Sequence, residues 1–412
     1  MYNYENQIMK SISMFFAGSI MPSQQGGLPL KLQKPIENII ENENFRTYSI
    51  NVKDIEADGS FLGKLREINI KGETESGGKE LKLFTKTIPE DGDVNIYSIT
   101  HTYRNETYMY TEFQKVITEV QEEANVPVNE RYTLAKSYES TDLEVLIMEN
   151  LAEQGYAMYP RKEVVTLKFA ELAIKHLAKY HSFAFIIKEK RPKFFQEKIQ
   201  KMKQPFFYGQ KAFTDFVRNF SLISINCLDP KQKAKMLEFL PTTYDKYGRY
   251  TEDPTDIRTM VHGDFRHSNL MAKFEDNEAQ EMIVIDYQHA FYGCSIIDLI
   301  YFIVAGTDQE FRKNHMEHLK NFYYESMREF LKLFDMDVES YYPREEFEKL
   351  YKDRLDYGLM VAMWLLPVIL ANKGEIPDVT KIDLATCDFQ LSDLIKKRVR
   401  GIVDDYIQWG YI

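Results

Sequence analysis

The decapeptide VHGDFRHSNL at residues 261–270, followed by IVID at residues 283–286, decides how this sequence is interpreted. Asp264 precedes Asn269 by five positions, and Asp286 ends an apolar run that is typical of a β-strand. Phosphoryl transferases show this spacing: one Asp contacts the acceptor hydroxyl, an Asn binds a metal ion and a later Asp holds Mg²⁺. The alternative is a plain β-hairpin whose polar residues cap turns, but two flanking strands at this spacing favour a catalytic loop.

These residue types suit the transfer of a phosphoryl group from ATP. ATP brings several negative charges close to an attacking oxygen, so Mg²⁺ held by a carboxylate is needed to neutralise the phosphates. An Asn carbonyl adds a hard oxygen ligand without adding a second charge beside Asp264. We therefore predict Asp264 as the catalytic residue, Asn269 and Asp286 as the metal ligands, and ATP and Mg²⁺ as the cofactors.

The chain falls into two unlike halves. In the first half, turn-forming residues separate short β-favouring runs, and apolar residues then recur at helical spacing before two more strand signals. Strands are expected at 45–52, 61–70, 81–87, 132–138 and 143–148, and a helix at 99–124. After Gly155 the pattern is mostly helical, with the exception of residues 258–286.

This order of elements predicts an α+β class and a bilobal, protein-kinase-like fold. An N-terminal extension would cover residues 1–35, and a small nucleotide-binding lobe at 36–149 would hold a five-stranded antiparallel sheet and one long helix. A large, mainly helical lobe would cover residues 150–412, where catalysis and substrate binding are expected. Other α+β arrangements share the pattern, so the motifs must decide between them.

Composition places the chain among folded proteins and limits its partners. Of its 412 residues, 44% are hydrophobic and 28% charged, and the net charge is -11. An acidic chain has no general attraction to nucleic-acid phosphates or anionic lipids, so we expect neither nucleic acid nor membrane as a partner. The longest apolar run, residues 357–371, contains Pro367 and is shorter than the ~20 residues of a membrane-spanning helix, which favours a buried helix. Three cysteines without a CxxC pair indicate a reducing compartment, and we expect a cytoplasmic location.

Further stretches make the interpretation more specific. They are LFTKTIP at residues 83–89, LIMENL at 146–151 with Gly155, and the catalytic stretch with IDYQ at 285–288. On these residues the sequence resembles the ecdysteroid kinase-like family, within the wider group of aminoglycoside phosphotransferase and choline kinase-like small-molecule kinases. The resemblance extends over about residues 40–305. It implies an ATP-dependent kinase whose acceptor is a small-molecule alcohol, namely an ecdysteroid or a related steroid or xenobiotic.

Side chains that bind the nucleotide are expected in the first half. Lys86 ends the third strand, where kinases place a lysine that contacts the phosphates of ATP. Glu106 lies on the apolar stripe of the long helix, and we predict that it pairs with Lys86 because an unpaired buried charge is costly. Taken alone, Lys86 could be a solvated strand end, and Glu106 could reach the edge of the lobe.

Two backbone regions complete the predicted nucleotide site. Gly59, Ser60 and Phe61, between the first two strands, occupy the place of a loop that covers the phosphates, although they also suit an ordinary hairpin turn. The backbone groups of Glu149 and Leu151, in the linker after the fifth strand, are expected to bind adenine.

Departures from protein kinases favour a small-molecule acceptor. Gly263 replaces the arginine of the His-Arg-Asp motif, and Asp286 is followed by Tyr287 and Gln288 instead of Phe and Gly. Regulation by activation-loop phosphorylation is therefore not expected. Asp298, at the start of an apolar helix, is interpreted as a structural residue that caps the helix or supports the loop.

The acceptor pocket, the oligomeric state and three other functions remain open. An aromatic cluster could line a steroid pocket or only pack the helical core, and its members are Phe194, Phe195, Phe206, Phe207, Tyr208 and Trp364. One alternative is a choline, ethanolamine or aminoglycoside-type kinase, and another is a catalytically silent kinase fold that acts as a binding protein. The third is a metal-dependent hydrolase with the ligands His262, Asp264, His267, Asp286 and His289.

Overall fold

The computed structural model describes residues 27–55, 63–88, 96–138, 145–372 and 390–412. Within these ranges the chain forms two compact units. The first contains residues 27–55, 63–87, 137–138 and 145–150, and the second contains Ile88 and residues 96–136, 151–372 and 390–412.

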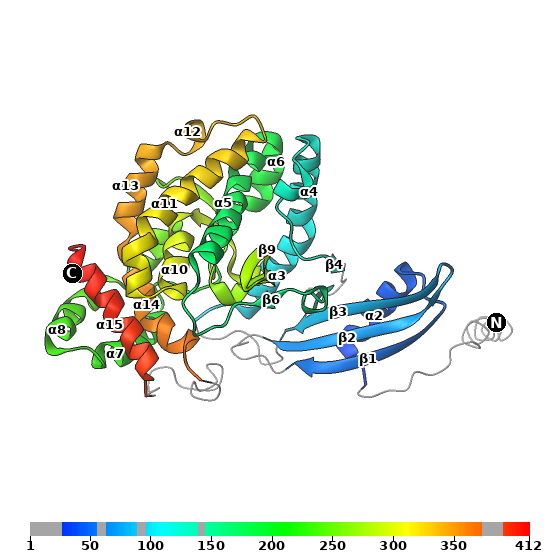
Figure 1. Ribbon diagram of the computed structural model, residues 1–412, viewed down its shortest axis with the longest axis horizontal. Coiled ribbons are helices and arrows are strands. Elements are labelled where there is room, and N and C mark those ends of the chain that lie inside the picture. The colour runs from blue at the N-terminus through cyan, green and yellow to red at the C-terminus, as the bar shows by residue number, and fades with distance from the viewer. Residues whose placement is uncertain (1–26, 56–62, 89–95, 139–144, 373–389) are drawn as a thin grey trace, which may run out of the picture. The chain divides into compact units, whose positions relative to one another are not determined.

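A five-stranded antiparallel sheet forms the first unit, with the strand order β1-β2-β3-β5-β4. Its strands are β1 (Thr47–Ile55), β2 (Lys64–Thr74), β3 (Gly77–Thr87), β4 (Ser137–Tyr138) and β5 (Val145–Glu149) (Figure 1). Buried and less buried side chains alternate along β2, so Ile68 and Ile70 lie on the same face of the sheet. This is expected for a sheet that is covered on one side. Helix α2 (Leu30–Asn42) covers this face with apolar side chains at helical spacing, namely Leu32, Ile36, Ile39 and Ile40.

The fourth strand is shorter than the sequence predicts. The strand expected at 132–138 pairs only over Ser137–Tyr138 in the described residues. At the start of the expected strand, the Tyr132 backbone N–H donates to Gln121 Oε1 at 2.7 Å, and Gln121 Nε2 donates to the Tyr132 carbonyl at 3.1 Å. A side chain thus satisfies the backbone groups that a neighbouring strand would otherwise bind. The prediction was wrong for residues 132–136 for this reason.

One long helical segment near the start of the second unit matches the helix expected at 99–124. It consists of α3 (Ile99–Tyr108), a π-helical turn at Met109–Phe113 and α4 (Gln114–Glu123). Ser98 caps its start by accepting a hydrogen bond from the backbone N–H of His101. A π turn uses i→i+5 hydrogen bonds and is common at functional sites. The apolar spacing predicts the helix but not this turn.

Helices make up most of the second unit. Helix α5 (Leu167–Lys190) is buried over most of its second half and packs against α11 (Gln309–Lys332). The other helices are α6 (Pro192–Phe194), α7 (Lys211–Asn226), α8 (Pro230–Phe239), α9 (Lys246–Glu252), α10 (Ile296–Gly306), α12 (Val338–Tyr341), α13 (Arg344–Arg354), α14 (Asp356–Ile369) and α15 (Asp393–Gln408).

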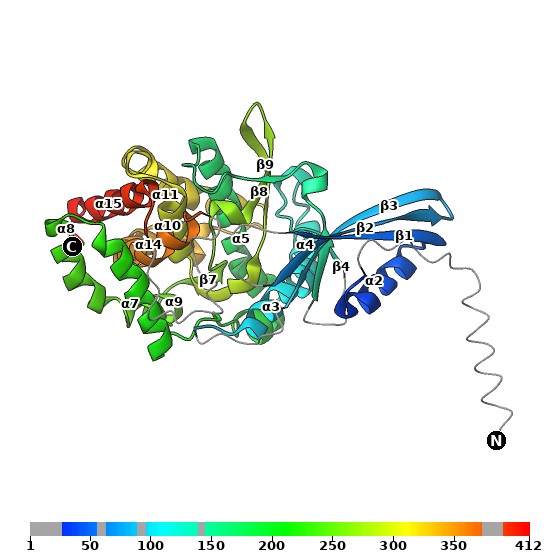
Figure 2. The ribbon, with the colours of Figure 1, turned by 90° about the horizontal axis from the view of Figure 1, so that it is seen from below.

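Short strands interrupt this helical unit, and β7, β8 and β9 lie in the range 258–286 where the sequence predicts an exception, whereas β6 and β10 lie outside it. Strand β7 (Arg258–Val261) pairs with β10 (Phe291–Cys294), and β8 (Leu270–Glu275) pairs with both β6 (Ala157–Met158) and β9 (Glu278–Val284). Figure 2 shows the β8–β9 hairpin extending away from the helices. The catalytic stretch lies between β7 and β8, and the predicted second metal ligand follows β9.

The longest apolar run forms a buried helix, as predicted. Most residues of α14 are buried, although Pro367 lies inside it. Across the described ranges, no helix combines the length and the apolar character that crossing a lipid bilayer requires.

Candidate active site

The catalytic stretch turns sharply at Gly263. Its φ is 80°, a left-handed conformation that favours glycine. A Cβ atom at this position would lie 2.5 Å from the carbonyl oxygen of His289, so any larger residue would also clash. The local backbone therefore requires the glycine that stands where protein kinases have an arginine.

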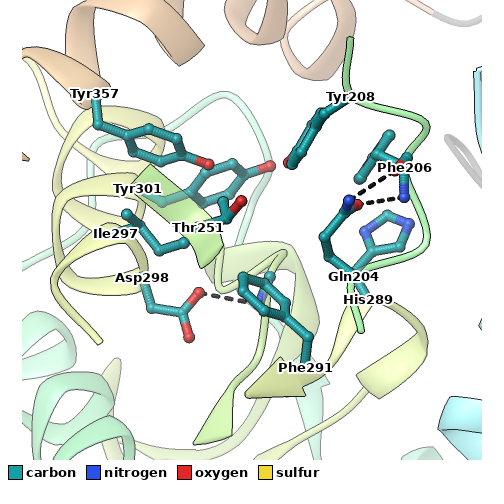
Figure 3. Close-up of a pocket in the computed structure, with 11 residues that line it drawn as sticks. Gln204, Phe206, Tyr208, Thr251, His289, Phe291, Ile297, Asp298, Tyr301 and Tyr357 are labelled. Carbon is teal, nitrogen blue, oxygen red and sulfur yellow. Dashed lines mark hydrogen bonds between the residues drawn. The ribbon is translucent and has the colours of Figure 1, made fainter. Parts of the chain in front are cut away.

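Asp298 of α10 holds the backbone of this turn. Its Oδ2 accepts the His262 backbone N–H at 2.6 Å, and its Oδ1 accepts the Gly263 N–H at 3.0 Å (Figure 3). Oδ2 also lies 3.1 Å from Nε2 of His181, whose Nδ1 lies 2.7 Å from the Tyr323 hydroxyl. Asp298 is 1% exposed, so every one of these bonds is shielded from water. Its predicted role as a support for the loop is confirmed.

His262 ties the turn to the strand that precedes Asp286. Its Nε2 lies 3.0 Å from the Ile285 carbonyl, which can only accept, and its Nδ1 lies 3.3 Å from the Asp264 backbone N–H, which can only donate. The two contacts together fit the tautomer that carries a proton on Nε2 and an accepting lone pair on Nδ1. Both ring nitrogens are thereby occupied by the protein.

Three side chains donate hydrogen bonds to the carboxylate of Asp264, which is 7% exposed. Tyr301 Oη donates to Oδ1 at 2.6 Å, and Arg266 Nε lies 3.0 Å from Oδ1 and 3.1 Å from Oδ2. Asn269 Nδ2 donates to Oδ2 at 3.0 Å and to the Asp264 carbonyl at 2.9 Å. Burial opposes the charge of Arg266, but Asp264 and the more distant Asp286 raise its pKa. The carboxylate is therefore fixed in position beside a permanent cation.

Asp286 follows β9 with a φ of 68°, in the left-handed region. Such a conformation costs a non-glycine residue about 1–3 kcal/mol and is found at active sites. Its backbone N–H donates to the Tyr110 hydroxyl in the π turn, at 3.2 Å. Close by, Asn105 Nδ2 of α3 donates to the Ala290 carbonyl at 2.9 Å. The long helical segment thus fixes the chain around Asp286 at two points.

A pocket opens beside this turn, within the second unit (Figure 3). Its lining is mainly aromatic, and consists of Gln204, Phe206, Tyr208, Thr251, Gly263, His289, Phe291, Ile297, Asp298, Tyr301 and Tyr357. The Phe206 ring lies 5.9 Å from that of Tyr208 and 5.0 Å from that of His289. Gln204 fixes this wall, because its side-chain amide exchanges two hydrogen bonds with the Phe206 backbone.

Neutral groups dominate the pocket. Among the described residues that line it, Asp298 is the only acidic one, and both of its carboxylate oxygens already bind the protein. Burial raises the pKa of Tyr208, Tyr301 and Tyr357, so their hydroxyl groups stay protonated and can donate hydrogen bonds. The pocket therefore combines apolar aromatic walls with neutral donors.

The model of the ecdysteroid kinase-like family matches residues 59–336. The chain belongs to the ecdysteroid kinase-like family. This agrees with the resemblance noted in the sequence. Together with the five-stranded antiparallel sheet and the helical remainder, it confirms the predicted α+β, kinase-like class. No curated protein sequence matches the chain.

Several solved structures are similar to this chain at low identity. Choline kinase LicA from Streptococcus pneumoniae is 13% identical, with a TM-score of 0.34 and coverage of 81% of this chain and 96% of that one. The GDP complex of aminoglycoside 2'-phosphotransferase-IIIa is 10% identical, with a TM-score of 0.38 and coverage of 82% and 91%. A glucosamine kinase with glucosamine, ADP and inorganic phosphate is 12% identical, with a TM-score of 0.36 and coverage of 83% and 80%. Scores this low carry no argument about function.

The predicted metal ligands lie in neighbouring segments. The Ile285 backbone N–H donates to the Asn269 carbonyl at 3.0 Å, so the residue before Asp286 binds the loop directly. Because Asn269 Nδ2 is used on Asp264, its Oδ1 is the atom that could bind a metal. Mg²⁺ commonly takes one or two protein carboxylates together with phosphates and water, so an Asn oxygen and an Asp carboxylate fit a magnesium nucleotide.

The described residues do not provide a set of metal ligands for the hydrolase alternative. In the part of the chain that the structure describes, no group of three or more His, Cys, Asp or Glu side chains could hold a metal ion. Of its proposed ligands, His262 uses both ring nitrogens within the protein, and His267 Nε2 lies 3.0 Å from the Arg161 carbonyl. A hydrolytic metal centre is not supported.

The predicted nucleotide residues are divided between the two units. Lys86 is 7% exposed and pairs with Leu146 near the end of β3, and Glu149 ends β5, both in the first unit. Glu106 and Leu151 belong to the second unit, and the predicted Lys86–Glu106 pair stays a prediction.

For the other residues predicted to bind the nucleotide, the structure gives contacts within their own unit. In the second unit, burial raises the pKa of Tyr110 most, and Glu106 and Asp286 raise it further, which places both carboxylates near this hydroxyl. The Leu151 carbonyl accepts N–H groups from Gln154 and Tyr156, at 3.0 and 3.1 Å. The predicted phosphate loop, Gly59, Ser60 and Phe61, lies outside the described residues.

The structure adds residues that the sequence reasoning missed. Arg266 lies inside the quoted motif, and Tyr301 lies three positions after Asp298, on the same face of α10. That spacing was the available signal for Tyr301. Of the aromatic cluster, Phe206 and Tyr208 line the pocket. Other members pack elsewhere: Phe195 against Tyr292, and Trp364 against Phe216.

Proposed function

We propose that this protein transfers the γ-phosphoryl group of ATP to a hydroxyl of an ecdysteroid or a related steroid or xenobiotic alcohol, in a magnesium-dependent reaction. Membership of a kinase-like family supports a phosphotransferase. The observation that carries the proposal is the Asp264 carboxylate, which is held by Tyr301, Arg266 and Asn269 next to an aromatic pocket.

In this mechanism, the chain mainly positions the reactants. Asp264 orients the acceptor hydroxyl and takes its proton as the acceptor oxygen bonds to the γ-phosphorus. Asn269 and Asp286 would hold Mg²⁺, which would neutralise phosphate charge. Most of the acceleration comes from this positioning and from charge neutralisation in a site that excludes water.

The remaining predicted residues bind the nucleotide. Lys86, fixed by Glu106, and backbone amides near Gly59 grip the phosphates, while the backbone of Glu149 and Leu151 binds adenine. These assignments come from the sequence motifs and from the family resemblance.

The lining of the pocket favours a neutral acceptor over a cationic one. An aminoglycoside or an ethanolamine carries ammonium groups that need a free carboxylate partner, because burying an unpaired charge is costly. Asp298 offers none, since its oxygens bind the His262 and Gly263 amides and lie against His181. Choline remains the best alternative, because aromatic faces alone attract a quaternary ammonium.

The test is Mg²⁺-dependent phosphate transfer from ATP to a panel of ecdysteroids, other hydroxylated steroids, xenobiotic alcohols, choline, ethanolamine and an aminoglycoside. We expect a neutral alcohol to gain one phosphate. Asp264→Asn should lower turnover by roughly 10²–10⁴-fold while the protein still folds and binds ATP. Normal turnover in this variant would refute the assignment of Asp264. A wild-type protein that does not bind Mg-ATP would instead favour a catalytically silent kinase fold.

A further inference from the structure

Tyr301 lies between the aromatic pocket and the predicted base. It lines the pocket, whereas Asp264 is not among the described residues that line it. The Tyr301 hydroxyl donates to Asp264 Oδ1 at 2.6 Å, and the two residues are 6% and 7% exposed. An acceptor in this pocket therefore meets the Tyr301 oxygen on its way to Asp264.

Tyr301 has the hydrogen-bonding groups needed to lie between the acceptor hydroxyl and Asp264. Its single proton is used on Asp264, but a phenolic oxygen also has lone pairs that can accept an O–H group. Figure 3 shows its hydroxyl turned toward the side of the pocket where the Tyr208 hydroxyl lies. The acceptor hydroxyl can thus donate to Tyr301 while Tyr301 donates to Asp264.

Other residues keep Asp264 and Tyr301 aligned. Arg266 Nε lies within hydrogen-bond distance of both carboxylate oxygens and Asn269 donates to Oδ2, which holds the carboxylate with Oδ1 in contact with Tyr301. Asp298, one turn before Tyr301 on α10, binds the backbone just before Asp264. Helix α10 therefore positions both the catalytic loop and Tyr301. The fold itself thus sets the distance between the Tyr301 hydroxyl oxygen and Asp264 Oδ1.

We propose that Tyr301 is a catalytic residue that relays the acceptor proton to Asp264, a role that rests on the proposed kinase function. As the acceptor oxygen bonds to the γ-phosphorus, its proton passes to Tyr301 Oη, and the proton of Tyr301 passes to Asp264 Oδ1. The bond between the γ-phosphorus and the β–γ bridging oxygen breaks, and its electron pair leaves with ADP. Tyr301 ends neutral, and Asp264 ends protonated.

The two proton transfers occur together. Burial raises the pKa of Tyr301 well above its ordinary value, and the negative charge of Asp264 raises it further. A free tyrosinate is therefore too costly to form as an intermediate. Tyr301 can give up its proton only while it receives another.

The experiment compares Tyr301→Phe with Tyr357→Phe in the full-length protein, on whichever alcohol the wild-type protein phosphorylates. Both variants remove one hydroxyl from the same pocket and keep the ring. We expect Tyr301→Phe to lower kcat by about 10²-fold with little change in the KM for ATP. Tyr357→Phe should instead change mainly the KM for the acceptor. A double-mutant cycle combines Tyr301→Phe with Asp264→Asn. The kcat of the double variant should be no lower than that of Asp264→Asn alone.

A solvent-isotope measurement on the wild-type protein gives an independent readout, in case a variant folds poorly. The dependence of kcat on the deuterium fraction should be curved, as expected for two protons in motion, and it should become linear in Tyr301→Phe. A linear wild-type dependence would overturn the relay, as would a Tyr301→Phe kcat within twofold of wild type. Absence of phosphate transfer by the wild-type protein would overturn the proposed function itself, and the relay with it.

Discussion

The sheet of the first unit and the catalytic turn of the second are held in place by different means. In the sheet, backbone pairing sets the position of Lys86, and the ion pair Lys53–Glu67 between β1 and β2 is largely exposed, at 73% and 35%. In the turn, buried side chains from distant helices hold the backbone, as Asp298 does. Removing a single side chain should therefore damage the turn far more than the sheet.

The largest effect is expected for Asp298→Ala. This change leaves the buried N–H groups of His262 and Gly263 without an acceptor, and His181 loses its carboxylate partner. The free energy of unfolding should fall by about 3–5 kcal/mol, and turnover should fall with it. The matched control, Lys53→Ala, removes an exposed ion pair and should cost less than about 1 kcal/mol. If urea unfolding showed the same loss of unfolding free energy in both variants, the predicted difference between the two units would be wrong.

A pair of glycine variants sharpens the same comparison. Gly77, the first residue of β3, has a φ of 114°, and a Cβ atom added there would meet no described atom within 4 Å. Gly263 instead combines a φ of 80° with a clash at the His289 carbonyl. Gly77→Ala should cost about 1–2 kcal/mol from backbone strain alone. Gly263→Ala should cost more and should also lower kcat, by up to about 10²-fold, because it displaces Asp264. Thermal unfolding and turnover measure the two effects, and normal kcat in Gly263→Ala would contradict this account.

The smallest effect concerns pH. Burial lowers the pKa of His181, and the nearby Asp298 only partly opposes this shift. Because the unfolded chain then binds a proton more readily than the folded one, stability due to His181 is present at neutral pH and is lost as pH falls below about 6.5. Wild-type protein should therefore lose more unfolding free energy between pH 7 and pH 5 than His181→Gln does. An identical loss in both would show that His181 does not titrate in this way.

The sequence predicts the local parts of this molecule well. Asp264 and Asn269 lie in one short loop between two strands, and the hydrogen bond from Asn269 to Asp264 is set by that local geometry. The strands near 47–55, 64–74, 77–87 and 145–149 follow from alternation and turn residues, which also act over short distances.

Long-range contacts could not be predicted in the same way. Asn105 binds the Ala290 carbonyl across 185 positions, and Tyr301 reaches Asp264 from a separate helix. Periodicity identifies such residues as buried but does not identify their partners. The backbone groups of Tyr132 bind the side chain of Gln121, which explains why the strand predicted there does not form.

The π turn at Met109–Phe113 has a consequence for how members of the family are aligned. A π turn accommodates one more residue than an α-helical turn, so it shifts the buried face of α4 by one position relative to α3. Deleting a single residue there would rotate Tyr110 or all of α4 by about 100°. A one-residue gap at this point in a related sequence would therefore mark a protein in which either the tyrosine contact to the residue matching Asp286 or the buried face of α4 differs.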